Sequence, residues 1–308
     1  MTALMHLAAR HGRALLILGL VLGIALPGLA LVMRDWIPET IAALLFFAAL
    51  RIGPRAAMGA MADVGSTLGV LAITQLAFPL LLTMAFLAAG WTGPLAMGLI
   101  LMAAAAPISG SPSITIMTGN DPAPALRVMI FGTALLPLTV IPVFWLLPAL
   151  DGGGAVLLAA GRLLLVIAIA VACGFLVRAF VMRDPGPDAI KSIDGVSAIL
   201  LGVVVIGLMS AVGPAITADP VGLAINLAVA FAVNFVLQIA TTAALRRAGR
   251  DRVAVPYGIV TGNRNIGIFL TALPLSVTDP LLLFIGCYQI PMYLTPMLLG
   301  RFYAARHA

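Results

Sequence analysis

Charge is scarce along this 308-residue chain: 9% of its residues are Asp, Glu, Lys or Arg, whereas 62% are hydrophobic. A soluble domain carries about 25% charged residues, and so few charges cannot cover a water-facing surface. The mean hydropathy of +1.16 points the same way. The composition excludes an ordinary soluble domain and predicts an all-α polytopic membrane protein whose main solvent is lipid.

Side chains for catalysis and metal binding are also scarce. His6, His11 and His307 lie near the chain ends, while the two cysteines, Cys173 and Cys287, lie in apolar runs. We therefore expect no metal site, no disulfide framework, no catalytic residue and no cofactor. The net charge of +6 comes from basic residues between apolar runs, which is typical of membrane topology and not of nucleic-acid binding.

Ten apolar runs are long enough to cross a bilayer, since one span needs about 20 residues. They cover 14–33, 36–52, 65–89, 93–119, 124–148, 155–181, 190–213, 220–245, 253–274 and 280–300. Arg34 and Arg162 lie on one side of these spans, Arg264 lies within a span, and the remaining basic residues lie on the side of the two termini. The positive-inside rule then predicts cytoplasmic termini in a bacterial-type inner membrane.

A run of three glycines after Asp151 divides the chain into two five-span halves, 1–150 and 151–308, which we expect to form one membrane domain. Because five is odd, the second half enters with opposite orientation, as in an inverted-topology repeat. The fourth span of each half is its polar one. We predict that the fourth and ninth helices are broken over Ser109–Thr115 and Val260–Asn265, cross, and meet near the bilayer midplane. Close helix packing through small residues is the plainer alternative for either segment alone.

Arg264 is the unusual residue of the ninth span. The nearest charges along the chain, Arg252 and Asp279, are roughly 18–22 Å away on a helix with 1.5 Å rise per residue, so Arg264 is expected near the midplane. An arginine there costs about 2.5–3.5 kcal/mol on insertion scales, and no carboxylate is expected inside a span to offset it. Its planar fork suits a bound carboxylate or phosphate. The alternative is a guanidinium that locks broken-helix carbonyls.

The predicted substrate-binding residues are those polar side chains of the two breaks that face the proposed cavity. They are Arg264, Asn265, Asn263, Thr261, Ser111 and Ser113. Gln75 and Gln238 occupy the third spans of the two halves, and each is expected to bond to a neighbouring helix.

With these residues in view, the whole chain resembles the bile acid:sodium symporter superfamily, in which two inverted five-helix repeats cross at broken fourth and ninth helices. Counted back from Asp121, Ser111 and Thr115 fall on the family's Ser and Thr of the fourth helix, while Pro112 falls on its Asn. Counted forward from Pro107, Ser113 falls on that Asn. Possible ion-binding residues implied by the resemblance are Gln75, Ser111, Thr115 and Asn265.

The ninth helix departs from the family's pattern. Gly262 and Asn265 match its Gly and Asn, but Val260 stands at the position of its sodium-binding Glu and Arg264 at that of its Gln. A hard cation needs several oxygen ligands, and Arg264 would repel it. We therefore predict that the guanidinium stands where a sodium ion sits in that family, and that transport does not need sodium.

The function predicted from the sequence is secondary transport of a small, carboxylate-like organic anion across the inner membrane by alternating access. The partners expected are that anion and the lipid bilayer, with no nucleic acid and no evident obligate protein partner. The main alternative is a non-transporting receptor or sensor with a transporter-like fold. A channel is less consistent with paired breaks in one chain.

Overall fold

The computed structural model describes residues 2–59, 64–150 and 152–304, so Asp63, Asp151, Arg306 and His307 lie outside the described residues. Within these ranges the chain is helical, and the residue pairing outside helices is one antiparallel bridge between Pro107 and Arg264. The protein is therefore an all-α protein, as the composition predicts.

Six stretches of the described chain are long and apolar enough to cross a membrane. They are Ile37–Gly59, Val64–Ala88, Gly153–Val181, Pro187–Ala218, Pro220–Arg247 and Leu275–Leu298. A seventh results if Thr2–Arg10 and Ala14–Ala25, which are bent by 86°, are taken as one span. Their length and composition indicate a membrane protein.

Ten spans were expected, and the difference lies in helices that are interrupted. The fourth predicted span is divided into α7 (Pro94–Ala104) and α8 (Ser111–Met117), and the fifth into α9 (Ala123–Thr139) and α10 (Ile141–Leu146). The ninth consists of α15 (Asp251–Gly262) and a 3₁₀ segment. The pieces of these three spans are shorter than the six long stretches, and the longest of them, α9, has 17 residues.

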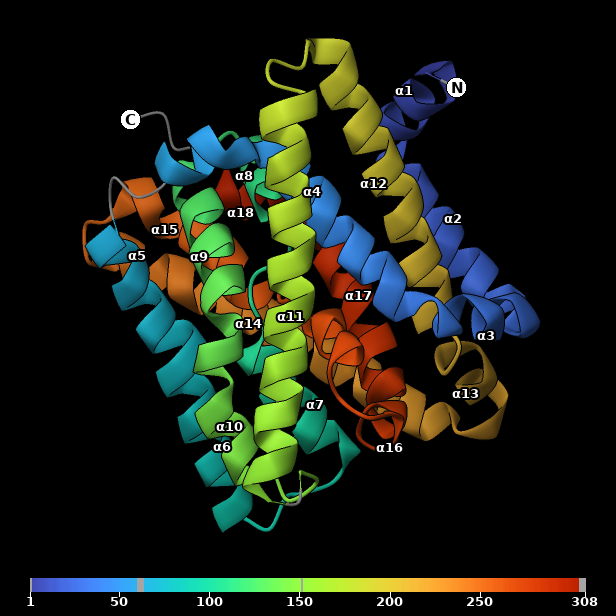
Figure 1. Cartoon of the computed structure of the whole chain (residues 1–308). Coiled ribbons are helices and arrows are strands. Elements are labelled where there is room, and N and C mark those ends of the chain that lie inside the picture. Colours follow the sequence, from blue (N-terminus) through green and yellow to red (C-terminus); the bar gives the residue numbers. More distant parts are fainter. Residues whose placement is uncertain (1, 60–63, 151, 305–308) are drawn as a thin grey trace. The chain divides into compact units, whose positions relative to one another are not determined.

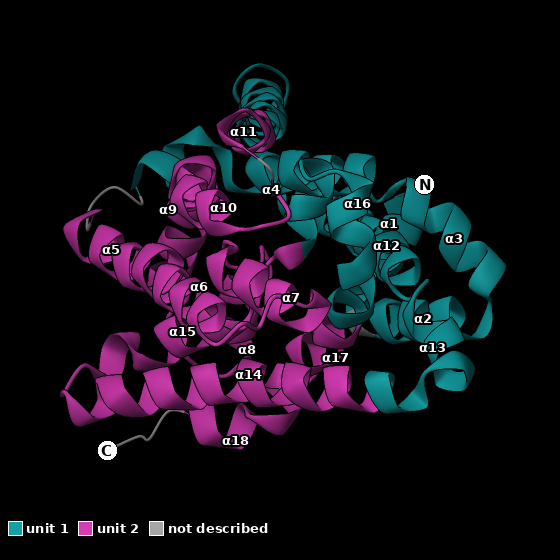
Figure 2. Cartoon of the chain, turned by 90° about the horizontal axis from the view of Figure 1, so that it is seen from below, with its two compact units in different colours: residues 1–59, 161–223, 267–286 teal, residues 60–160, 224–266, 287–308 magenta. Residues whose placement is uncertain are grey.

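The chain forms two compact units, coloured separately in Figure 2. Unit 1 contains residues 1–59, 161–223 and 267–286, and unit 2 contains residues 60–160, 224–266 and 287–308. Both units draw on both sequence halves. Three helices, α11 (Gly153–Leu176), α14 (Pro220–Arg247) and α17 (Leu282–Leu298), contribute residues to both units.

Unit 1 is built around α12 (Pro187–Leu208), which packs against four N-terminal helices (Figure 1). These are α1 (Thr2–Arg10), α2 (Gly12–Ala25), α3 (Pro27–Asp35) and α4 (Ile37–Gly59). Unit 1 also contains the short helices α13 (Val212–Ala218) and α16 (Leu275–Thr278). Two further short segments of this unit are η3 (Val177–Val181) and η5 (Asp279–Leu281). A Cβ atom at Gly207 would lie 2.9 Å from the Arg34 nitrogen, so this glycine lets α12 approach the chain closely.

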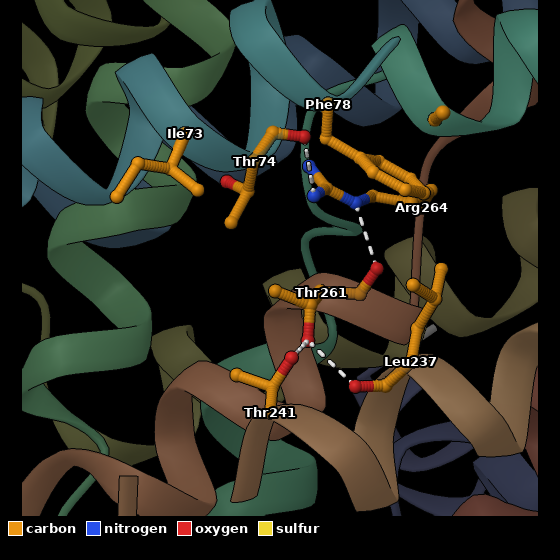
Figure 3. A pocket seen from close by; sticks show the side chains of 8 residues that line it. Ile73, Thr74, Phe78, Leu237, Thr241, Thr261 and Arg264 are labelled. Carbon is orange, nitrogen blue, oxygen red and sulfur yellow. Dashed lines mark hydrogen bonds between the residues drawn. The ribbon is translucent and has the colours of Figure 1, made fainter. Parts of the chain in front are cut away.

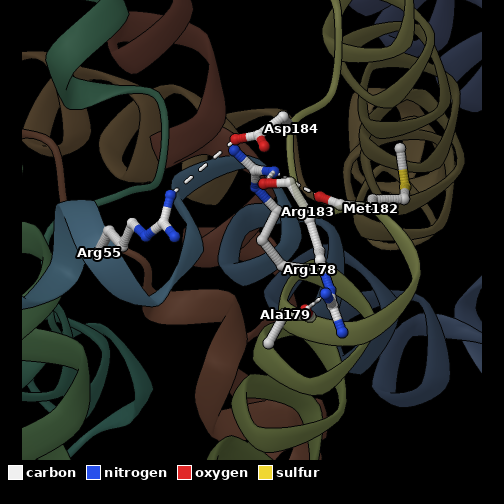
Figure 4. Close-up of polar contacts among 6 residues, drawn as sticks. All are labelled: Arg55, Arg178, Ala179, Met182, Arg183 and Asp184. Carbon is white, nitrogen blue, oxygen red and sulfur yellow. Dashed lines mark hydrogen bonds and ion pairs between the residues drawn. The ribbon is translucent and has the colours of Figure 1, made fainter.

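Ion pairs between arginines and aspartates join the helix ends and loops of unit 1. Arg34 pairs with Asp279, and Arg51 Nε lies 2.5 Å from an Asp194 carboxylate oxygen. Figure 4 shows a third group, in which Arg55 lies 4.0 Å from Asp184. These pairs are exposed to different degrees, and such surface pairs contribute about 0–1 kcal/mol each. They position the loops of this unit without dominating its stability.

The kink in α4 is covered by a fourth arginine. Gly53 has φ +74°, a left-handed conformation that favours glycine, and Pro54 follows it. Arg178 packs over Gly53 and donates from Nη1 to the carbonyls of Met182 at 2.5 Å and Arg183 at 2.8 Å (Figure 4). The kink and the end of η3 are thereby joined within unit 1.

Unit 2 carries the interrupted helices. Besides α7–α10, α15 and most of α14 and α17, it contains α5 (Val64–Leu71), the π-helical segment η2 (Ala72–Ala77), α6 (Phe78–Ala88) and α18 (Gly300–Tyr303). Helix α9 packs against α5, α8 and α15. An apolar cluster of Leu71, Ala125, Val128, Tyr257 and Val260 fills the space between α5, α9 and α15.

Both predicted helix breaks occur, but their positions were predicted imprecisely. The first runs from Ala105 to Gly110, and helix resumes at Ser111 because Pro112 lies in the first turn, where no backbone N–H is needed. The second covers only Asn263 to Asn265, because α15 continues through Gly262. The predicted non-helical ranges Ser109–Thr115 and Val260–Asn265 were therefore wrong in their boundaries.

Candidate functional site

The two breaks meet inside unit 2. The Ile108 nitrogen donates to the Asn263 carbonyl at 3.0 Å, and the Asn265 nitrogen donates to the Ala106 carbonyl at 2.8 Å. Together with the Pro107–Arg264 bridge, these bonds form a short antiparallel pairing. Each break thus satisfies backbone groups that the other helix end releases, as unwound backbone in a membrane protein requires. The two broken segments therefore meet and pair through their main chains.

Arg264 lies at this crossing with its side chain buried. The residue is 2% exposed, and it is the one buried ionised side chain among those the structure describes. Its Nε donates to the Thr261 carbonyl, Nη1 to the Ala105 carbonyl and Nη2 to the Thr74 carbonyl, each at 3.0 Å. We call these three oxygens the carbonyl cage. It surrounds a cation with main-chain acceptors and contains no carboxylate.

Two of the cage oxygens come from helix C-terminal ends. Ala105 directly follows α7, and Thr261 lies in the last turn of α15. The last carbonyls of a helix lack intrahelical partners and carry the negative end of its dipole. A guanidinium at this place therefore satisfies orphan acceptors and is itself stabilised by both helix ends.

The third cage oxygen is released by a π-helical turn. In an α-helix the Thr74 carbonyl would accept from the Phe78 nitrogen, but in η2 that nitrogen donates to Ile73. The residue one position further, which a π-helix would use, is Pro79, and proline has no N–H. The Thr74 carbonyl therefore has no partner within its own helix and accepts the hydrogen bond from Arg264 (Figure 3).

A neutral network of amides and hydroxyls holds the other side of the second break. Asn234 donates to the Gly262 carbonyl at 2.5 Å, and Gln238 donates to Asn234 Oδ1 at 2.6 Å. Asn263 Nδ2 donates to Gln238 Oε1 at 3.1 Å, which also accepts from the Tyr303 hydroxyl at 2.9 Å. We call this set the amide network. It fixes the position of the backbone that carries Arg264.

A cavity of about 160 Å³ opens beside Arg264 within unit 2 (Figure 3). It is lined by Ile73, Thr74, Phe78, Ala103, Leu237, Thr241, Thr261 and Arg264. Ile73, in the candidate span Val64–Ala88, is 66% exposed, whereas Arg264 is 2% exposed. The cavity combines apolar walls with one cationic group, an arrangement suited to a small amphiphilic anion.

Two of the predicted substrate-binding residues, Thr261 and Arg264, line this cavity. Asn263 belongs to the amide network, and Asn265 is half-buried with its backbone nitrogen bonded to Ala106. On α8, Ser111 is buried and Ser113 is exposed. Neither serine lines the cavity.

The predicted ion-binding residues likewise lie at different places in unit 2 and do not line the cavity. Gln75 is buried and donates to the Gly132 carbonyl at 2.9 Å and to Thr139 at 3.0 Å, which confirms its expected interhelical bond. Thr115 donates within α8 to the Ser111 carbonyl at 2.9 Å. Gln238 likewise bonds across helices, to Thr295 on α17 at 3.1 Å.

Sequence reasoning missed the residues that contribute main-chain oxygens or apolar walls. Thr74, Ala105, Phe78 and Leu237 carry no side-chain signature of a site, although Pro79 is a signal that a carbonyl upstream lacks its partner. The chain matches no protein-family model and no curated protein. The class that fold and site define is thus an all-helical membrane protein with two broken helices that cross at a caged arginine.

Proposed function

We propose that this protein is a secondary transporter that carries a small organic anion across the inner membrane by alternating access. The observation that carries the proposal is the crossing itself: two broken helices, one from each sequence half, pair through their main chains around Arg264. Paired discontinuous helices at corresponding positions of two repeats are typical of transporter binding sites.

We further propose ten spans arranged as an inverted repeat. Unit 1 takes its long helices from the first two predicted spans of each half, and unit 2 takes most of the third, fourth and fifth of each half. Gln75 and Gln238, on the third spans, both bond to neighbouring helices. The ion pairs Arg34–Asp279 and Arg51–Asp194 join residues that the ten-span assignment places on the same side. These correspondences support the repeat.

We also propose that the guanidinium of Arg264 replaces a coupling cation. Three carbonyls already surround it, and a second unit charge about 4 Å away would cost about 4 kcal/mol at an effective dielectric constant of about 20. Val260 packs in the apolar cluster with Tyr257 and Leu71, where it supplies no oxygen. Transport without sodium follows from this arrangement.

Uptake into proteoliposomes tests the proposed function directly. We expect radiolabelled small carboxylates to accumulate by counterflow at the same rate in sodium and in choline buffer, because the cation is part of the protein. Vesicles with the Arg264→Gln variant serve as the control. Binding of carboxylates without any uptake would instead favour the receptor alternative.

The proposed topology makes a separate prediction for cysteine labelling. Gly154→Cys and Thr217→Cys, in a background without Cys173 and Cys287, should react with an impermeant reagent added from outside. A Cβ at Gly154 meets no atom within 4 Å, and Thr217 is exposed, so both substitutions should be tolerated. Labelling of either site from the cytoplasmic side alone would contradict the ten-span assignment.

A further inference from the structure

We propose that the cavity beside Arg264 binds a monocarboxylate with a compact apolar body of about the size of benzoate. This inference rests on the proposed transport function and specifies its substrate class. It concerns a site built wholly from unit 2, since all eight lining residues belong to that unit.

The volume sets the size of the ligand's body. An apolar protein cavity of about 150 Å³ is known to hold benzene, and this cavity measures about 160 Å³. A six-membered ring or a short branched chain therefore fills it. A fused-ring skeleton or a long acyl chain would extend beyond its walls.

The charges of the cavity select a single anionic group. Arg264 is the one charged lining residue. Its three cage bonds use three of the five N–H groups of a guanidinium, which leaves one N–H on each terminal nitrogen. Two N–H groups match the two oxygens of one carboxylate. A second carboxylate would lie against apolar walls without a partner, which is costly.

The threonine hydroxyls do not add a second strong donor group. Thr74 Oγ1 donates to the Val70 carbonyl at 2.8 Å. Thr261 Oγ1 lies 2.9 Å from the Tyr257 carbonyl and 3.1 Å from Thr241 Oγ1. The Thr74 and Thr261 hydroxyls are thus engaged with the helices that carry them, and Thr241 Oγ1 accepts from Thr261 Oγ1, so all three line the cavity as neutral groups. Recognition of charge is left to Arg264.

The position of Arg264 orients the ligand. It is 2% exposed and is the one charged lining residue, so the carboxylate lies against it. The apolar body then lies among the other lining residues, which include Phe78 and Leu237 (Figure 3).

Three matched ligands test the proposed class on the purified full-length protein. Binding of benzoate, benzamide and isophthalate is measured by calorimetry. We expect benzoate to bind at least tenfold more tightly than benzamide, which lacks the charge, and than isophthalate, whose second carboxylate points toward the side walls. Equal affinity for benzamide, or a preference for isophthalate, would overturn the proposal.

A filled cavity tests the location. Thr241→Phe places a ring among the lining residues, whereas Ile239→Phe lies two residues away on α14, is 39% exposed and does not line the cavity. We expect the first variant to weaken benzoate binding at least tenfold and the second to leave it unchanged. Thr241→Leu repeats the test with a smaller side chain if the melting temperature of the phenylalanine variant falls.

The outcomes separate the site from the transport function. Benzoate binding that Thr241→Phe removes, without counterflow in vesicles of the unmodified protein, would refute transport and leave the site intact. Anion counterflow that continues at the full rate in Thr241→Phe would refute the site and leave transport intact.

Discussion

Arg264→Gln is expected to abolish transport and to lower the melting temperature. Hydrogen bonds to charged groups contribute about 1.5–3 kcal/mol each, and glutamine cannot serve all three cage oxygens, which come from Thr261, Ala105 and Thr74. Loss of one such bond to a bound carboxylate corresponds to a roughly 10–150-fold fall in affinity. Counterflow and thermal unfolding of the purified variant measure the two effects.

The double variant Arg264→Gln with Val260→Glu shows whether the arginine acts as a built-in cation. It restores the residues that the resembled family carries at both positions, and the introduced glutamate supplies the charged oxygen that a sodium site needs. We expect partial recovery of transport and a melting temperature that rises with sodium concentration. The unmodified protein should show neither dependence.

Two results would contradict this reading of Arg264. Uptake by the unmodified protein that disappears when choline replaces sodium would show that a free cation is required. A purely structural lock predicts that Arg264→Gln loses stability while the affinity of the surviving protein for benzoate stays the same. Melting temperature and affinity must therefore both be measured in the single variant.

Gly262→Ala is expected to disrupt the folded state. A Cβ atom there would overlap the Gln238 side chain and the Asn234 carbonyl, and Gly262 itself accepts hydrogen bonds from Asn234 and from the Tyr288 hydroxyl. Overpacking of a core costs typically 1–3 kcal/mol, and loss of a buried hydrogen bond adds roughly 1–3 kcal/mol. We expect a total cost of about 3 kcal/mol or more, seen as a lower yield and melting temperature.

Gly69→Ala is the matched control for that substitution. Gly69 lies on α5 in the same unit, and a Cβ there meets no atom within 4 Å. Alanine favours helix over glycine by about 1 kcal/mol, so this variant should be at least as stable as the unmodified protein. Similar melting temperatures for the two variants would show that the crossing tolerates a larger residue at Gly262.

The sequence allowed the membrane class and both breaks to be predicted because they depend on local chemistry. Apolar runs define helices in lipid, and Pro107 and Asn263 mark where backbone leaves the helix. The boundaries were wrong because Pro112 is compatible with a first helical turn. The division into two units was not predictable, since it depends on contacts between distant segments.

Within the site, the importance of Arg264 was predictable and its partners were not. A charge far from other charges in an apolar run requires compensation, and side chains were the obvious source. The compensation comes from main-chain oxygens of Thr74, Ala105 and Thr261, which any residue type possesses. Asn263 was assigned to the substrate by its polarity, and in the structure its side chain donates to Gln238.

During synthesis of the chain, two oxygens of the carbonyl cage are made long before the arginine that they bind. Thr74 is synthesised 190 residues before the arginine that satisfies its carbonyl, and Ala105 is synthesised 159 residues before it. At about 5–20 residues per second, translation needs roughly 10–40 s to cover the longer interval. During that time the early segments carry unsatisfied oxygens that the hydrocarbon region does not tolerate. A nascent chain that stops before Arg264 should therefore remain beside the insertion machinery and become a substrate for membrane proteases.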